Sequence, residues 1–402
     1  MSLNEQSALE QTYMMHTINR EPVCLVKGSG MNVYDDQGKE YLDFLGGIGV
    51  CSLGHCHPAV TKAISDQAAK LIHISNLFYI EHRGQVAHMV SDLLNAYVPT
   101  DEQSPWQSFF ANSGAEANEC AIKLARRWSQ SFGTGGSTIL TLDGGFHGRT
   151  LASLAATAQP AKQERFQPLP AGFAHTPLND CEALEKAFEQ HGDEICAIMV
   201  ECIQGEGGVH PCTPEFLQTA QRVAHEHKAV LICDEVQSGV YRCGRPFAFQ
   251  LFGITPDIVS IAKGIASGFP MGMCAARQNV AAAFEPGDHG STFGGSNLAV
   301  AAAHATLTTL AQEGILENAQ TVGSYLREQL ATLDDVVEVR GYGLMDACDL
   351  RDGIDAPTVV LKALSCGLLL NATGPHTLRF LPPLICSTND VDVLMEKLPT
   401  IL

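Results

Sequence analysis

One lysine, Lys263, stands alone in the stretch VSIAKGIASGFPMG, residues 259–272, which contains no acidic residue. A lysine on a solvated surface extends its ammonium into water, and this is its usual role. In apolar surroundings desolvation disfavours the ammonium and lowers the pKa of the amine from about 10.4. A neutral amine can attack an aldehyde. Because apolar residues precede Lys263 and glycines follow it, we expect it to be a nucleophile.

A carboxylate, Asp234, directly follows the apolar run AVLIC, residues 229–233. One interpretation is a strand-end carboxylate in solvent. If the run is a buried strand, however, the carboxylate emerges from the core and needs a cationic or hydrogen-bonded partner. A protonated pyridine nitrogen would supply one.

Ser113, Gly114 and Ala115 precede a helical pattern, so the serine is a candidate N-cap. The same position offers free N–H groups and the positive end of the helix dipole, which together can bind phosphate. The glycine-rich DGGFHGR, residues 143–149, adds the ring of Phe146, which can stack on a flat ligand. Arg149, three residues on, is suited to bind a substrate carboxylate through two hydrogen bonds.

A phosphate site, a carboxylate for a ring nitrogen and a lysine for an aldehyde together describe pyridoxal 5′-phosphate. The carboxylate keeps the pyridine protonated, so that the ring withdraws electrons from the carbanion formed on deprotonation. Other motifs add no second cofactor. GHCHP (54–58) is too tightly spaced for a usual metal site, and HEHK (225–228) is not H-E-x-x-H. GSGMNV (28–33) lacks the third glycine of a dinucleotide-binding loop. We expect no metal site.

Short apolar runs separated by helical patterns predict the elements that position these groups. The runs are QSFFAN (107–112), STILTL (137–142), CAIMVEC (196–202), AVLICDE (229–235) and DIVSIAK (257–263). Because they are nearly continuous rather than alternating, they indicate strands buried on both faces of a parallel sheet, and hence an α/β fold. Each leads to polar or glycine-rich residues. Ligands of open α/β sheets bind beyond the carboxyl ends of the strands, so we expect one shared site there.

The chain length of 402 residues suggests two domains. Residues 26–50 predict a hairpin. After about residue 310, a helix and two strand-like segments, VVEVRGYGLMDACDL and TLRFLPPL, indicate a smaller α+β domain that the N-terminal hairpin joins.

The net charge of −19 argues against a nucleic-acid or anionic-membrane partner. No run approaches the eighteen apolar residues expected of a membrane-spanning helix, and the first thirty residues lack the apolar segment of a signal peptide. The fourteen cysteines contain no C-x-x-C spacing, and several lie in apolar runs, where a free thiol behaves as a small hydrophobe. We therefore expect a cytoplasmic protein.

The set SGAEAN, GGFHGRT, QGEGGV, LICDEVQSG, IAKG…GFPMG and GSTFGG, in this order, resembles the class-III aminotransferases of pyridoxal-phosphate fold type I. The resemblance runs from about residue 20 to 395. Within the class, HISNLFY (73–79) and LLNATGPHTLRFLPPL (368–383) look most like the acetylornithine aminotransferases.

The resemblance implies a large domain, residues 61–305, with a mainly parallel seven-stranded sheet between helices, and a small domain formed by residues 1–60 and 306–402. It also implies a homodimer with active sites shared between subunits. The expected activity is ping-pong transfer of the δ-amino group of N2-acetyl-L-ornithine to 2-oxoglutarate. The alternatives are the same chemistry on succinylornithine, N-succinyl-diaminopimelate, ornithine or 4-aminobutyrate, a pyridoxal enzyme that does not transaminate, and an inactive binding homologue.

The resemblance also assigns roles to individual residues. Lys263 would bond to the cofactor's aldehyde and Asp234 would contact the pyridine nitrogen. The other cofactor-binding residues would be Ser113, Gly114, Ala115, Phe146, Glu235, Val236, Gln237 and, from the neighbouring subunit, Thr292. Arg149 would hold a substrate carboxylate, Ser291 would lie near the substrate, and Glu206 would pair with Arg379.

The chain also departs from the family pattern. Cys202 stands where proline is usual, Ser296-Asn297 replaces an Asn-Pro pair, and Tyr241 and Ser267 occupy glycine positions. None of these changes removes a catalytic group, but they alter loops near the expected site.

Overall fold

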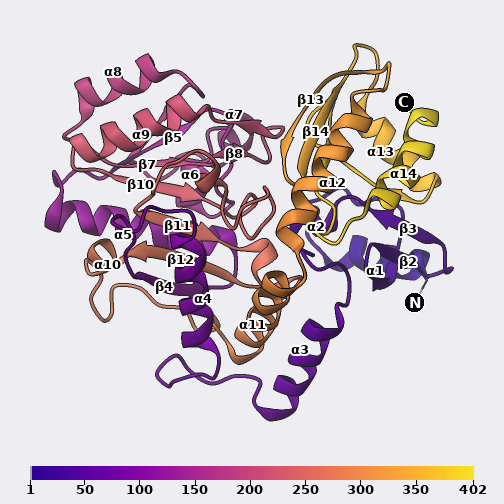
Figure 1. The fold of residues 1–402 in the computed structure, drawn as a ribbon, viewed down its shortest axis with the longest axis horizontal. Helices are drawn as coiled ribbons and strands as arrows, with labels where there is room; N and C mark the ends of the chain where they lie inside the picture. Colours follow the sequence, from indigo (N-terminus) through magenta and orange to yellow (C-terminus); the bar gives the residue numbers. More distant parts are fainter. Residues whose placement is uncertain (1) are drawn as a thin grey trace.

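The computed structural model describes residues 2–402, so Met1, which was predicted to belong to the smaller domain, lies outside the described residues. A seven-stranded sheet forms the centre of the larger part, with helices around it (Figure 1). In spatial order its strands are β4 (Trp106–Ala111), β12 (Gly272–Arg277), β11 (Ile258–Ile261), β10 (Val230–Asp234), β7 (Ile195–Val200), β5 (Thr138–Leu142) and β6 (Phe173–Thr176). They run in one direction except β12, which is antiparallel to both neighbours. The predicted α/β fold with a mainly parallel sheet is confirmed.

The strands of this sheet are buried on both faces, as their continuous apolar sequences predicted. In β10, Val230 and Ile232 belong to the core cluster that includes Ala121 of α5 (Gly114–Phe132). Leu231 and Cys233 face the opposite cluster, which includes Phe216 of α9 (Pro214–Glu226). All five apolar runs named above are strands of the sheet, and β6 and β12 were not among them.

Helices surround the sheet and connect its strands. Those in this part of the chain are α3 (Pro58–Lys70), α4 (Arg83–Asn95), α5 (Gly114–Phe132), α6 (Leu151–Ala156), α7 (Pro160–Gln163), α8 (Cys181–His191), α9 (Pro214–Glu226), α10 (Gln278–Ala281) and α11 (Asn297–Gln312). Three 3₁₀ turns and a short two-stranded ladder complete this part of the chain. The turns are η1 (Glu164–Phe166), η2 (Ala248–Leu251) and η3 (Lys263–Ala266), and the ladder pairs β8 (Ile203–Gln204) with β9 (His210–Pro211).

Segments from both ends of the chain lie together at the right of Figure 1. One sheet has the order β1 (Leu25–Ser29), β2 (Asn32–Asp35), β3 (Glu40–Asp43) and β15 (Leu368–Leu369). The other has the order β13 (Val336–Tyr342), β14 (Met345–Leu350), β17 (Thr377–Phe380) and β16 (Asn371–Ala372). Their helices are α1 (Leu3–Tyr13), α2 (Gly46–Gly49), α12 (Ile315–Leu330), α13 (Ala356–Ser365), α14 (Thr388–Lys397) and the turn η4 (Leu398–Thr400). Because β15 pairs with β3, the two ends of the chain share a sheet.

Two of the predicted strand segments form antiparallel hairpins. The predicted N-terminal hairpin is present as β2 and β3, and β1 extends it to three antiparallel strands. The segment VVEVRGYGLMDACDL is a hairpin, β13 and β14, whose turn contains Gly343 at φ +58°. The exact domain boundaries stay a prediction. Within residues 2–402, no helix is long and apolar enough to cross a membrane.

Candidate active site

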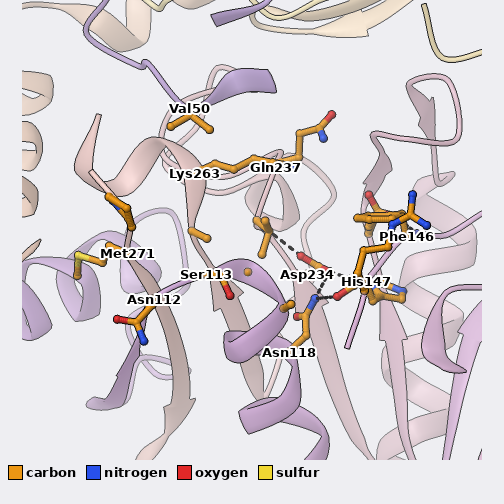
Figure 2. Close-up of a pocket in the computed structure, with 18 of the residues that line it drawn as sticks. Val50, Asn112, Ser113, Asn118, Phe146, His147, Asp234, Gln237, Lys263 and Met271 are labelled. Carbon is orange, nitrogen blue, oxygen red and sulfur yellow. Dashed lines mark hydrogen bonds and ion pairs between the residues drawn. The ribbon is translucent and has the colours of Figure 1, made fainter. Parts of the chain in front are cut away.

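A cavity of about 460 Å³ opens beyond the carboxyl ends of the central strands. The ends of β4, β7, β10 and β11 bring Ser113, Glu201, Asp234 and Lys263 to its wall, and the loop after β5 adds Phe146. Figure 2 shows Ser113, Phe146, Asp234 and Lys263 around the cavity. Asp234 and Lys263 come from the neighbouring strands β10 and β11. The strand ends that were predicted to form one site therefore border one cavity, and its function as a site stays a prediction.

The Asp234 carboxylate is buried, with 4% exposure, and held by two side chains. Its Oδ2 accepts a hydrogen bond from Asn118 Nδ2 (2.8 Å) and lies 2.8 Å from His147 Nδ1. Burial alone would lower the pKa of His147, but the hydrogen bond and charge of Asp234 raise it overall. The other oxygen, Oδ1, accepts only the Val236 N–H (3.0 Å) among the described residues. It therefore keeps a lone pair for a further donor, such as a protonated ring nitrogen.

The Lys263 amine makes no hydrogen bond or ion pair within residues 2–402. The residue begins η3, one residue after the end of β11, and its backbone is left-handed, with φ 47°. Burial lowers the pKa of the amine below 10.5; the Glu206 carboxylate opposes this effect, and the Arg379 charge adds to it. An amine without a partner and with a lowered pKa has the properties that the sequence predicted.

The first turn of α5 borders the cavity through Ser113, Gly114 and Ala115. Ser113 caps the helix, since its Oγ accepts the Glu116 N–H (3.2 Å). The N–H groups of Gly114 and Ala115 have no acceptor inside the helix. A Cβ on Gly114 would lie 2.6 Å from Val236 Cγ1, and a Cβ on Gly272 would lie 2.3 Å from the Ser113 carbonyl oxygen. With this close packing at both glycines, the free N–H groups of the helix N-terminus border the cavity, where they could bind an anion.

Phe146 and Arg149 lie together at the edge of the cavity. The guanidinium carbon of Arg149 is 5.6 Å from the centroid of the Phe146 ring, and Lys162 Nζ is 5.8 Å from the same centroid. Arg149 is exposed, and no carboxylate of the described residues pairs with it. Its charge is therefore available to an anionic ligand.

The expected pair of Glu206 and Arg379 is present. Arg379, with 1% exposure, donates from Nη1 to Glu206 Oε1 (2.7 Å) and to Gln237 Oε1 (3.0 Å). Its Nε and Nη2 both donate to Asn371 Oδ1 (3.1 and 2.7 Å). Burial would raise the pKa of Glu206, but the Arg379 charge and hydrogen bond lower it overall. Glu206 is thus an anion that masks a buried arginine.

Five predicted site residues do not line this cavity in the single chain. Glu206 and Arg379 lie behind its wall, where both contact Gln237. The other three are Glu235, Ser291 and Thr292. Glu235 turns its carboxylate away from the cavity, accepting the Phe249 N–H (2.8 Å) and the Ser238 hydroxyl (2.6 Å). Ser291 Oγ accepts the Gly294 N–H (2.9 Å). Ser291 and the exposed Thr292 border a different hollow of about 430 Å³. The roles assigned to these residues stay predictions.

Among the cavity residues that were not identified from the sequence, Asn118, His147 and Glu201 hydrogen-bond to Asp234 or to the surrounding loops. Glu201 directly follows the buried strand β7, just as Asp234 ends β10. A carboxylate at the end of an apolar run was therefore a signal that could have identified Glu201. Its Oε1 accepts the Phe146 N–H (2.7 Å) and its Oε2 the Gly205 N–H (2.9 Å). Asn118 lies in α5 and His147 lies in the loop after β5, and only the folded chain shows that both contact Asp234.

Two of the sequence departures adopt the backbone that glycine favours. Tyr241 has φ 67° and Ser267 has φ 42°, conformations that are uncommon for residues with a Cβ. The Ser267 hydroxyl accepts the Leu53 N–H (3.0 Å), and this hydrogen bond helps to hold the loop after Lys263.

Comparisons with known proteins agree with this geometry. The model of the family "Aminotransferase class-III" matches residues 13–402. The acetylornithine aminotransferase of Caldanaerobacter subterraneus subsp. tengcongensis is 46% identical over 398 residues, 98% of either chain. The crystal structure of acetylornithine aminotransferase from Elizabethkingia anophelis has a TM-score of 0.86 at 30% identity, covering 100% of this chain and 99% of that one. An ornithine aminotransferase from Toxoplasma gondii, described as having partial occupancy of PLP at its active site, has a TM-score of 0.91 at 30% identity, covering 99% and 94%.

Proposed function

Since the chain belongs to the class-III aminotransferases and is a pyridoxal-phosphate-dependent transaminase, we propose that its amino donor is N2-acetyl-L-ornithine. It would transfer the δ-amino group to 2-oxoglutarate in a ping-pong reaction of arginine biosynthesis, in the cytoplasm. The observation that carries this proposal is the 46% identity, over 98% of the chain, to an acetylornithine aminotransferase.

The residues of the cavity fit the cofactor. The free N–H groups of Gly114 and Ala115 would bind its phosphate, and Asp234 Oδ1 has a lone pair for its ring nitrogen. Phe146 and Val236 would cover the ring, and the unpaired Lys263 amine would bond to its aldehyde. When bound, pyridoxal phosphate withdraws electrons from the substrate carbon that loses a proton and carries the amino group between the two substrates.

The chain's own residues then position charges and move one proton. Lys263 Nζ would take the proton from the substrate carbon that bears the amino group and return it on the cofactor side, as a general base and acid. Its lowered pKa suits this role, because the neutral amine is the base. His147 and Asn118 hold the Asp234 carboxylate in place for the ring nitrogen.

Two arginines would distinguish the substrates. Arg149 would bind a carboxylate of either substrate at the outer edge of the cavity. An ω-amino donor has no carboxylate beside its reacting carbon, so Glu206 can stay on Arg379. Glutamate has one there, and Glu206 would have to move aside and free Arg379 for it.

We also propose a homodimer in which Thr292 of one subunit reaches the phosphate site of the other. The position of Thr292 supports this, because it is exposed and borders a hollow outside its own chain's cavity. Ser291, on the same loop, would approach the partner's substrate.

A panel of amine donors tests the substrate assignment. The protein, loaded with pyridoxal phosphate, would be given 2-oxoglutarate and N2-acetylornithine, N-succinylornithine, N-succinyl-diaminopimelate, ornithine or 4-aminobutyrate, with Lys263→Ala as the inactive control. We expect the highest kcat/KM for N2-acetylornithine. A higher value for any other donor would replace the proposed substrate. Glutamate formation from none of them would contradict the proposed reaction.

A further inference from the structure

The Glu201 carboxylate joins two loops of the active site. It follows β7, borders the cavity and is 6% exposed. One of its oxygens accepts the N–H of Phe146 (2.7 Å) and the other accepts the N–H of Gly205 (2.9 Å). The first loop carries the ring proposed to cover the cofactor, and the second carries Glu206. No step of the proposed mechanism uses Glu201.

The backbone of Gly205 sets the position of the neighbouring side chains. A Cβ on Gly205 would lie 2.2 Å from Gln237 Oε1, so the glycine packs directly against that amide. Gln237 in turn donates to Glu206 Oε1 (3.3 Å) and accepts from Arg379 Nη1 (3.0 Å). A shift of Gly205 would therefore disturb both the residue next to it, Glu206, and the amide that bridges Glu206 to Arg379.

The environment of Glu201 is unusual for a carboxylate. Burial raises its pKa to about 7, with His147 opposing and the Asp234 charge adding to this effect. No cation forms a direct ion pair with Glu201 among the described residues. Its two backbone donors are thus its main direct partners, and they belong to the two loops.

We propose that Glu201 is a positioning residue that holds the Phe146 and Gly205 loops together and so keeps Glu206 on Arg379. It thereby favours amino donors without a carboxylate beside the reacting carbon. This inference rests on the proposed role of the Glu206–Arg379 pair.

Glu201→Gln tests the inference, because an amide has only one acceptor oxygen and can satisfy only one of the two N–H groups. Binding of glutarate, whose two carboxylates match Arg149 and Arg379, would be measured by calorimetry on the cofactor-loaded protein without an amino donor. We expect its Kd to fall roughly tenfold, about 1.4 kcal/mol, because Arg379 is less firmly masked. The Kd of butyrate, with one carboxylate, should stay within about twofold.

Single-turnover kinetics provide a second readout. We expect the ratio of the N2-acetylornithine half-reaction to the glutamate half-reaction to fall about tenfold in Glu201→Gln. The matched control is Asp257→Asn. Asp257 also accepts a strand N–H, that of Leu231 (2.8 Å), but it precedes β11, at the end away from Lys263. It should leave both the ratio and the glutarate Kd unchanged.

Unchanged glutarate binding in Glu201→Gln, or equal loss of both half-reactions, would overturn the inference. If Glu201→Gln does not fold, Glu201→Asp, which keeps the charge with a shorter reach, should shift glutarate binding in the same direction. Misfolding of both variants would assign Glu201 to folding and refute the positioning role. Failure of the proposed function is distinguishable, because the wild-type protein would then show no half-reaction with N2-acetylornithine.

Discussion

Replacement of Glu206 by alanine separates the two half-reactions of the proposed cycle. In the wild-type chain Glu206 Oε1 lies 2.7 Å from Arg379 Nη1, and Arg379 is 1% exposed. Without Glu206, an ω-amino donor leaves this buried cation without its ion pair. Glutamate supplies its own carboxylate to the same arginine, so its half-reaction does not need Glu206.

The size of the effect follows from the hydrogen bond that is lost. A hydrogen bond to a charged group contributes about 1.5–3 kcal/mol, which corresponds to a change of roughly 10- to 150-fold. Gln237 and Asn371 still contact Arg379 and keep it in place. We therefore expect kcat/KM for N2-acetylornithine to decrease by roughly 10- to 150-fold, while kcat/KM for glutamate changes by less than about threefold.

Stopped-flow absorbance of the bound cofactor measures each half-reaction with one substrate alone. Glu189→Ala, on the exposed surface of α8, is the control and should match the wild-type protein. Equal losses with N2-acetylornithine and glutamate in Glu206→Ala would refute the masking mechanism.

Three further predictions concern other parts of the site. Arg149→Ala should raise the KM of both N2-acetylornithine and 2-oxoglutarate roughly 10- to 100-fold, since one charged hydrogen-bonding partner is lost; an unchanged KM would place the carboxylate elsewhere. Gly272→Ala should destabilise the protein by about 1–3 kcal/mol and weaken cofactor binding, because its Cβ would meet the Ser113 carbonyl oxygen at 2.3 Å. Gly84→Ala, which meets nothing within 4 Å, should do neither in the same urea titrations. Folding lowers the pKa of Lys263 below the 10.5 of the unfolded chain. Between the folded-state pKa and 10.5 the unfolded chain therefore binds more protons, and the free energy of unfolding should rise with pH in that window. Cofactor-free Lys263→Met should lack this part of the rise, and an identical pH dependence in both proteins would contradict the lowered pKa.

The strands that build the site could be predicted because burial on both faces leaves a continuous apolar run, as in β7 and β10. The strands β6 and β12 left a weaker signal. β6, FAHT, is a short edge strand with an exposed histidine. β12, GMCAAR, consists largely of small residues, and because it is antiparallel its final Arg277 lies beside the first residue of β4, at the end away from the cavity.

Single-residue chemistry could also be predicted where a polar group ends such a run, as with Asp234 and Lys263. Contacts between distant segments could not be derived from residue patterns. Asn118 and His147 are separated from Asp234 by 116 and 87 positions, and only the fold brings them to its carboxylate. The Glu206–Arg379 pair was expected from the family resemblance alone, since nothing in the spacing of 173 residues indicates it.

Chemical trapping of the cofactor would show whether Lys263 is the lysine that bonds to its aldehyde. The protein would be loaded with pyridoxal phosphate, reduced with borohydride, digested and analysed by mass spectrometry. We expect the cofactor's mass to be attached to Lys263 and Lys263→Ala to retain none. Attachment at a different lysine, or no attachment in the wild-type protein, would contradict this role of Lys263.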